Sequence, residues 1–123
     1  MKKILLILFL VCDLFLVCSP LIAQDAKVTS LMSKPLPDMP GKELLMIMVE
    51  YPPGSSDPVH RHNAQAFLYV LEGSVVTLTP GQTFYEGPND IHTVGRNASK
   101  TMPAKFVVFL LKDKGAPVFV PVK

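Results

Sequence analysis

Three histidines, the only ones in the chain, stand at spacings that suit a metal site. His60 and His62 are separated by one residue, and residues i and i+2 of a β-strand point to the same face. His92 follows the turn residues Asn89 and Asp90, so a second segment can bring it to the same point. Three converging imidazoles suit a divalent transition metal that keeps open positions, and the pattern therefore predicts such a site.

Tyr85 and Glu86, which precede His92 in the same segment, are further candidates for a catalytic role. Glu86 could orient a histidine or act as a general base, although a surface glutamate beside a turn is an equally good interpretation. Tyr85, the residue before it, is the other catalytic candidate. Each histidine alone would also be an ordinary turn residue, so the metal prediction depends on all three acting together.

The composition favours an all-β fold. The chain has 123 residues, room for one domain, and its 12 prolines and 7 glycines imply frequent turns. Apolar or alternating runs predict strands at residues 43–51, 66–71, 74–79, 83–85 and 105–112. Residues 24–42 contain Pro35, Pro37 and Pro40, and we expect an extended N-terminal arm with few regular hydrogen bonds.

Residues 1–23 have the pattern of a secretory signal helix. Lys2 and Lys3 precede a long apolar run, and Ala23 ends the segment with a small residue. Cleavage there would give a secreted or periplasmic protein with no membrane segment and no cysteine. The alternative of an uncleaved membrane anchor is disfavoured by Asp13, and a lipoprotein anchor at Cys18 is weaker still.

The charge of the chain excludes one class of partner. The formal net charge is +2, and without the leader the chain carries ten basic and nine acidic residues. A nearly neutral chain does not have the excess of positive charge that nucleic-acid binding requires, and the sequence has no cluster of basic and aromatic residues. We therefore do not expect a nucleic-acid partner.

Two runs resemble the motifs of a known family. The run from Gly54 through His60 and His62 to Gly73 resembles the first cupin motif, and the run from Gly81 to His92, followed by Asn97, resembles the second. The resemblance implies a small jelly-roll β-barrel over residues 43–123 with a metal at its mouth. It also implies that His60, His62 and His92 bind manganese, iron, nickel, zinc or copper.

The chain departs from that family in two places. A carboxylate ligand is usual shortly after the second histidine, but residues 64–67 contain none, and Gln65 is the candidate for this fourth place. Only seven residues separate Gly73 from Gly81, where the family usually has a hairpin. We therefore expect a barrel that is incomplete on one side, and an open edge that a second copy could cover in a homodimer.

These observations support an exported cupin-domain protein that uses a divalent metal to bind or transform a small organic molecule. Dioxygenase, isomerase and lyase chemistry are all compatible with such a site, and the fold does not decide among them. Two alternatives remain: a metal-free module that binds a sugar-like ligand, and a degenerate cupin without catalytic activity.

Overall fold

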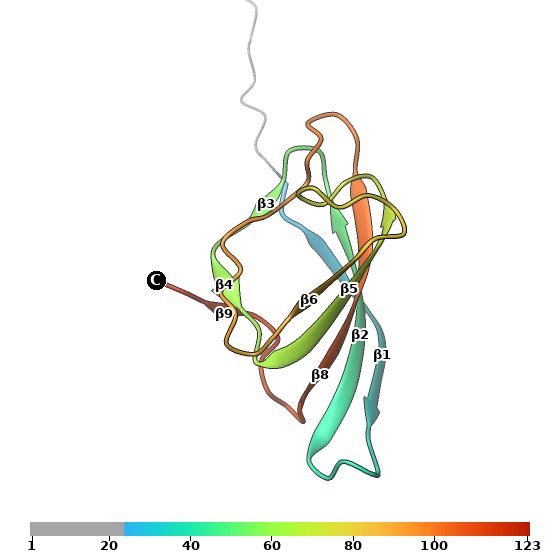
Figure 1. The fold of residues 1–123 in the computed structure, drawn as a ribbon, viewed down its shortest axis with the longest axis vertical. Coiled ribbons are helices and arrows are strands. Elements are labelled where there is room, and N and C mark those ends of the chain that lie inside the picture. The colour runs from blue at the N-terminus through green and yellow to red at the C-terminus, as the bar shows by residue number, and fades with distance from the viewer. Residues whose placement is uncertain (1–23) are drawn as a thin grey trace, which may run out of the picture.

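Figure 1 shows the computed structural model of the chain, which describes residues 24–123 as strands joined by turns. In this part of the chain there is no helix, and the predicted all-β fold is confirmed. The predicted signal helix lies outside the described residues. The strands are β1 (Lys27–Pro35), β2 (Lys42–Tyr51), β3 (Ser56–Asp57), β4 (His60–Arg61), β5 (Ala64–Glu72), β6 (Thr83–Glu86), β7 (Gly95–Arg96), β8 (Ala104–Asp113) and β9 (Val120–Pro121).

Residues 24–123 contain no helix that is long and apolar enough to span a membrane.

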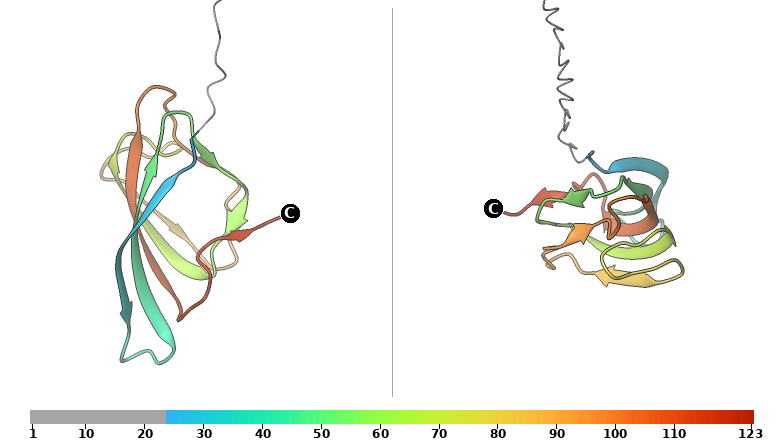
Figure 2. Two further views of the ribbon diagram at one scale, coloured as in Figure 1. Left: turned by 180° about the vertical axis from the view of Figure 1, so that it is seen from behind. Right: turned by 90° about the horizontal axis from the view of Figure 1, so that it is seen from above.

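The strands form one large antiparallel sheet and two short pairs. The large sheet has the order β1-β2-β8-β5-β6, while β3 pairs with β7 and β4 pairs with β9. Figure 2 shows the short pairs opposite one side of the large sheet, and the C-terminal segment crossing from the end of β8 to β4. The three sheets share no hydrogen-bonded ladder, so they do not close into a barrel.

The core lies between the large sheet and the short pairs. Along β2 and β8, alternate residues are buried, and Ile47 and Val49 pair with Val108 and Phe106. Leu110 is fully buried in the same layer. Burying a side chain of this size stabilises the fold by about 1.5–3 kcal/mol. Side chains of this apolar layer line one wall of the cavity described below.

The N-terminal arm differs from expectation. Residues 27–35 form β1, which pairs with β2 from Lys27↔Glu50 to Pro35↔Glu43, so the expectation of few regular hydrogen bonds was wrong. The prolines do not interrupt the ladder, because Pro35 is its last residue and the other two lie in the turn that follows. Since β1 lies beside β2 in the same sheet, β1 does not itself cover the outer face of β2, whose side chains are half-buried.

The predicted strand at residues 74–79 is a tight turn in the structure. Val75 and Leu78 exchange two backbone hydrogen bonds of 3.0 and 2.8 Å, and Val76 between them has a φ of 54°. The chain must reverse direction between the end of β5 and the start of β6, which pair antiparallel. Chain reversal therefore overrides the strand preference of valine and threonine here.

Asn97 fixes the corner between β2 and the loop that follows β7. Its side chain is buried, and its Nδ2 lies 3.2, 3.2 and 2.7 Å from the carbonyl oxygens of Tyr51, Pro52 and Met102. Its Oδ1 accepts a hydrogen bond from the backbone N–H of Ser99. The second motif therefore ends on a residue that ties two loops to the sheet.

We expect Asn97→Ala to lower the free energy of unfolding by about 1–3 kcal/mol, because it leaves buried carbonyl oxygens without a donor. Thermal or urea unfolding measures this effect. Asn89→Ala is the matched control, since Asn89 is exposed in a turn. Equal stability of the two variants would contradict the structural role of Asn97.

Candidate metal centre

The backbone brings the three histidines together. His60 and His92 exchange two backbone hydrogen bonds, from His92 N to His60 O (2.7 Å) and from His60 N to His92 O (3.2 Å). His62 follows His60 at the next position on the same face of the chain. One nitrogen from each of the three rings lies within 4.8 Å of the others, as the spacing of the histidines predicts.

Two of the rings have a determined tautomer. His60 Nδ1 lies 2.7 Å from the carbonyl oxygen of Pro58, and His62 Nδ1 lies 2.6 Å from that of Val118. A carbonyl oxygen only accepts hydrogen bonds, so each Nδ1 carries a proton and donates it. In the neutral form of each ring this leaves the lone pair on Nε2, which faces the cluster, where the two Nε2 atoms lie 3.2 Å apart.

His92 completes the cluster from the opposite segment. Its ring centre lies 4.9 Å from that of His60. Its Nδ1 is buried and makes no hydrogen bond, although it lies 3.1 Å from Glu86 Oε1. A buried polar nitrogen without a hydrogen-bond partner is uncommon in folded proteins and calls for an explanation such as an ion.

The donor set fits a divalent transition metal. Two nitrogens that bind one ion at about 2.0–2.1 Å, at angles between square and tetrahedral, lie roughly 3 Å apart. The 3.2 Å between His60 Nε2 and His62 Nε2 matches this separation. Neutral imidazoles with a protonated, hydrogen-bonded far nitrogen are the form in which histidine binds zinc, iron, nickel or copper. The three histidines could therefore hold such an ion.

The C-terminal segment supports the cluster. Val118 accepts the hydrogen bond from His62, and the ring of Phe119 stacks on His60 with centres 4.3 Å apart and planes at 22°. Buried Lys112, paired with Glu43, anchors this segment by donating to the carbonyl oxygen of Ala116 (2.8 Å). Phe119 was missed as a site residue, since the sequence presents it only within a short apolar run.

Tyr51 and Asp57 form the wall of the site beside His92. The Tyr51 hydroxyl donates a hydrogen bond to Asp57 Oδ2. Burial raises the pKa of the Tyr51 phenol well above its ordinary value, and the bond to Asp57 raises it further. Tyr51 therefore stays protonated and holds the Asp57 carboxylate in place. The sequence favours only a turn role for Asp57, and it contains no signal for this pairing.

The family of the chain follows from its sequence. Residues 47–110, more than half of the chain, match the family model of the cupin domain. The chain belongs to the cupin family. No curated protein matches it in sequence.

Solved structures share the fold of this cupin at low sequence identity. A cupin domain from Bordetella pertussis is 19% identical, with a TM-score of 0.57 over 72% of this chain and 94% of that one. A double-stranded β-helix protein from Klebsiella pneumoniae is 16% identical, with a TM-score of 0.60 over 80% and 86%. The polyketide cyclase RemF from Streptomyces resistomycificus is 20% identical, with a TM-score of 0.59 over 80% and 71%. At these identities the similarity shows a cupin-like fold.

Two residues proposed from the sequence lie away from the histidine cluster of this cupin. Gln65 was the candidate for the fourth ligand, but its Oε1 accepts a hydrogen bond from the Tyr85 hydroxyl. Both side chains lie on the outer face of the large sheet, because successive residues of a strand alternate between its faces. Gln65 is therefore not placed to bind the ion, and Tyr85 is not placed to act on a ligand there.

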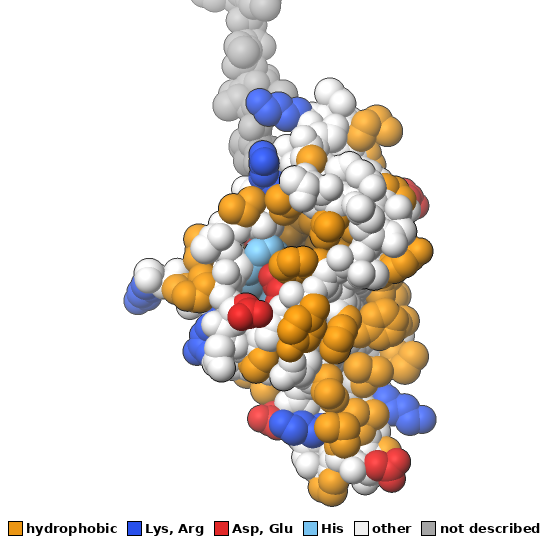
Figure 3. All heavy atoms as spheres, in the orientation of Figure 1, with side chains coloured by type: hydrophobic (Ala, Val, Ile, Leu, Met, Phe, Trp, Pro, Cys, Tyr) orange, Lys and Arg blue, Asp and Glu red, His pale blue; other side chains and the backbone are white. Residues whose placement is uncertain are grey.

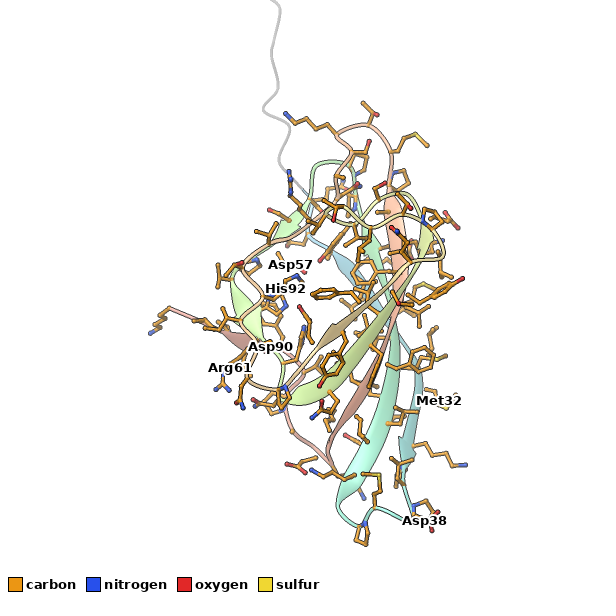
Figure 4. The ribbon with its side chains drawn as sticks, in the orientation of Figure 1. Met32, Asp38, Asp57, Arg61, Asp90 and His92 are labelled. Carbon is orange, nitrogen blue, oxygen red and sulfur yellow. The ribbon has the colours of Figure 1, made fainter. Side chains whose placement is uncertain are left out.

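The three histidines line a cavity of about 250 Å³. Figure 3 shows the histidines at the bottom of a hollow bordered by hydrophobic side chains, with acidic side chains beside them. Figure 4 shows Asp57 and His92 on the inner side of the short strands, whereas Arg61 points away. The apolar part of the lining includes Val49, Leu68, Phe84, Phe106, Val108 and Phe119.

Proposed function

We propose that this protein is an exported cupin that binds a divalent metal at His60, His62 and His92 and holds a small organic molecule against it. The observation that carries the proposal is the convergence of three imidazoles, two of them with Nε2 lone pairs facing each other at 3.2 Å. Without a metal ion or a shared proton between them, such lone pairs repel. The signal pattern of residues 1–23 supports export.

The cavity favours a largely apolar ligand. Its walls are mostly aliphatic and aromatic, and its polar groups are the histidines with Glu86 beside them and the Tyr51–Asp57 pair. Such a lining offers a sugar few hydrogen-bond partners, so the structure gives no support to the sugar-binding alternative. A small molecule with an apolar body and one oxygen function fits the distribution of polar groups better.

The residues of the chain prepare the site for such a ligand. Hydrogen bonds to Pro58 and Val118 keep a proton on Nδ1 of His60 and His62 and leave Nε2 free to bind, and Phe119 shields His60 from water on one side. Tyr51 keeps the Asp57 carboxylate oriented beside the ligand space. A bound divalent ion supplies Lewis acidity toward a ligand oxygen, or a site for dioxygen. Lyase, isomerase and dioxygenase chemistry all use such an ion.

Metal analysis of protein purified from the exported fraction tests this proposal. We expect about one divalent ion per chain and a mass that corresponds to cleavage after Ala23. Ligand at one hundred times its Kd stabilises a fold by about 2.7 kcal/mol. Chelation should therefore lower the unfolding temperature by about 10–20 °C, and a divalent ion should restore it. Protein that lacks metal, and whose stability no divalent ion changes, would contradict the proposal.

A further inference from the structure

Among the described residues 24–123, Glu86 contacts the histidine cluster and has no ion-pair partner outside it. Its Oε2 lies 3.4 Å from His62 Nε2, and its Oε1 lies 3.1 Å from His92 Nδ1. Its side chain is only 13% exposed. Among residues 24–123, no lysine or arginine pairs with this carboxylate, and no hydrogen-bond donor satisfies it. A largely buried carboxylate in such a position needs a cation.

Of the two histidines that face Glu86, His62 in its neutral form does not supply that cation, and His92 makes no hydrogen bond to it. His62 donates its Nδ1 proton to Val118, so its Nε2 presents a lone pair to the carboxylate oxygen. The Nε2 of His60 faces the same space from 3.2 Å. Two nitrogen lone pairs and an anionic oxygen therefore converge on one region, and a bound cation turns this repulsion into attraction.

The neighbouring strand explains how Glu86 reaches the cluster. Glu86 lies on β6 directly opposite Ala66 on β5, and both residues line the cavity. Paired residues on adjacent strands have Cβ atoms about 5 Å apart, and the small alanine leaves room for the longer side chain. A carboxylate on β6 can thus occupy space that a carboxylate on β5 would otherwise fill.

We infer that Glu86 is the fourth protein ligand of the metal, which makes the site three neutral imidazoles and one carboxylate. This inference rests on the proposed function, because it assumes that the histidines bind an ion. The carboxylate lowers the net charge of an occupied site from +2 to +1. It also favours ions that accept oxygen ligands, such as Mn²⁺ and Fe²⁺, over Cu⁺.

Binding of Mn²⁺ to chelator-treated protein tests the inference. We expect Glu86→Gln and Glu86→Ala to weaken Mn²⁺ binding by at least roughly tenfold, as loss of a ligand exceeds loss of its supporting groups. Glu72→Gln is the matched control, because Glu72 is exposed at the end of β5 and pairs with Lys105. In this control the affinity for Mn²⁺ should be unchanged.

A relocated carboxylate provides the second variant. In the double variant Ala66→Glu with Glu86→Ala, the carboxylate returns from the opposite strand, and we expect Mn²⁺ affinity to recover at least severalfold over Glu86→Ala. The visible absorption of bound Co²⁺ should change in Glu86→Gln and not in Glu72→Gln. Circular dichroism of the metal-free variants verifies that each is folded.

The experiment distinguishes failure of the Glu86 inference from failure of the proposed three-histidine site. If Glu86→Gln binds Mn²⁺ as tightly as the unaltered protein, with the same Co²⁺ spectrum, Glu86 is not a ligand, while the three-histidine site stands. If the unaltered protein binds neither Mn²⁺ nor Co²⁺, the proposed function fails together with this inference.

Discussion

Replacing His60 with alanine is expected to abolish the metal response of this cupin. His60 is the most buried of the three histidines, and its Nε2 faces that of His62. Loss of an outer partner of a metal ligand weakens binding by about 10–100-fold, and loss of the ligand itself should exceed this range. Added Mn²⁺ or Zn²⁺ should therefore leave the unfolding temperature of His60→Ala unchanged, while raising that of the unaltered protein.

The neighbouring residue provides the control for this prediction. Arg61 lies on the same short strand, but its side chain points away from the cluster and donates to Asn63. Arg61→Ala should respond to metal as the unaltered protein does. His60→Ala will also lose some stability without metal, because Pro58 loses its donor. The metal-dependent shift within each variant is thus the decisive quantity, and a full shift in His60→Ala would refute the role of His60.

Replacing Gly73 with alanine is expected to cause the largest loss of stability from a single methyl group. Gly73 has a φ of 69°, a conformation that costs other residues about 1–2 kcal/mol. An added Cβ would also lie 2.8 Å from Ala104 Cα, and closer still to the carbonyl oxygen of Pro103. Overpacking of this kind costs about 1–3 kcal/mol. We expect Gly73→Ala to lose about 3 kcal/mol in urea unfolding.

Gly81→Ala separates the two contributions. Gly81 also has a positive φ, 88°, but a Cβ there would meet no atom within 4 Å. It should therefore show only the conformational cost, about 1–2 kcal/mol. If Gly73→Ala is no less stable than Gly81→Ala, the close approach of Gly73 to the start of β8 does not constrain the fold.

Local features predicted the long strands well. The apolar run at residues 43–51 and the run at 105–112 with charged ends correspond to β2 and β8. These segments have enough consecutive apolar and β-branched residues for local preference and burial to agree. The prediction failed where local strand preference conflicted with the path of the chain. Residues 74–79 have the composition of a strand, but the chain must reverse direction between β5 and β6, and Val76 adopts a positive φ there.

The histidine spacing was informative for the same physical reason. A separation of two residues puts His60 and His62 on one side of the chain wherever the segment is extended. The resemblance to the cupin motifs added His92. The sequence alone therefore determined the all-β class and the three histidines of the site.

Only the tertiary structure decided which groups surround those histidines. Glu86 reaches the cluster because β6 pairs with β5 in a register that sets it opposite Ala66, whereas Gln65 falls on the other face. Val118 and Phe119 reach it because the C-terminal segment returns to pair with β4. Register and chain return depend on contacts between residues far apart in sequence, and no local pattern encodes them.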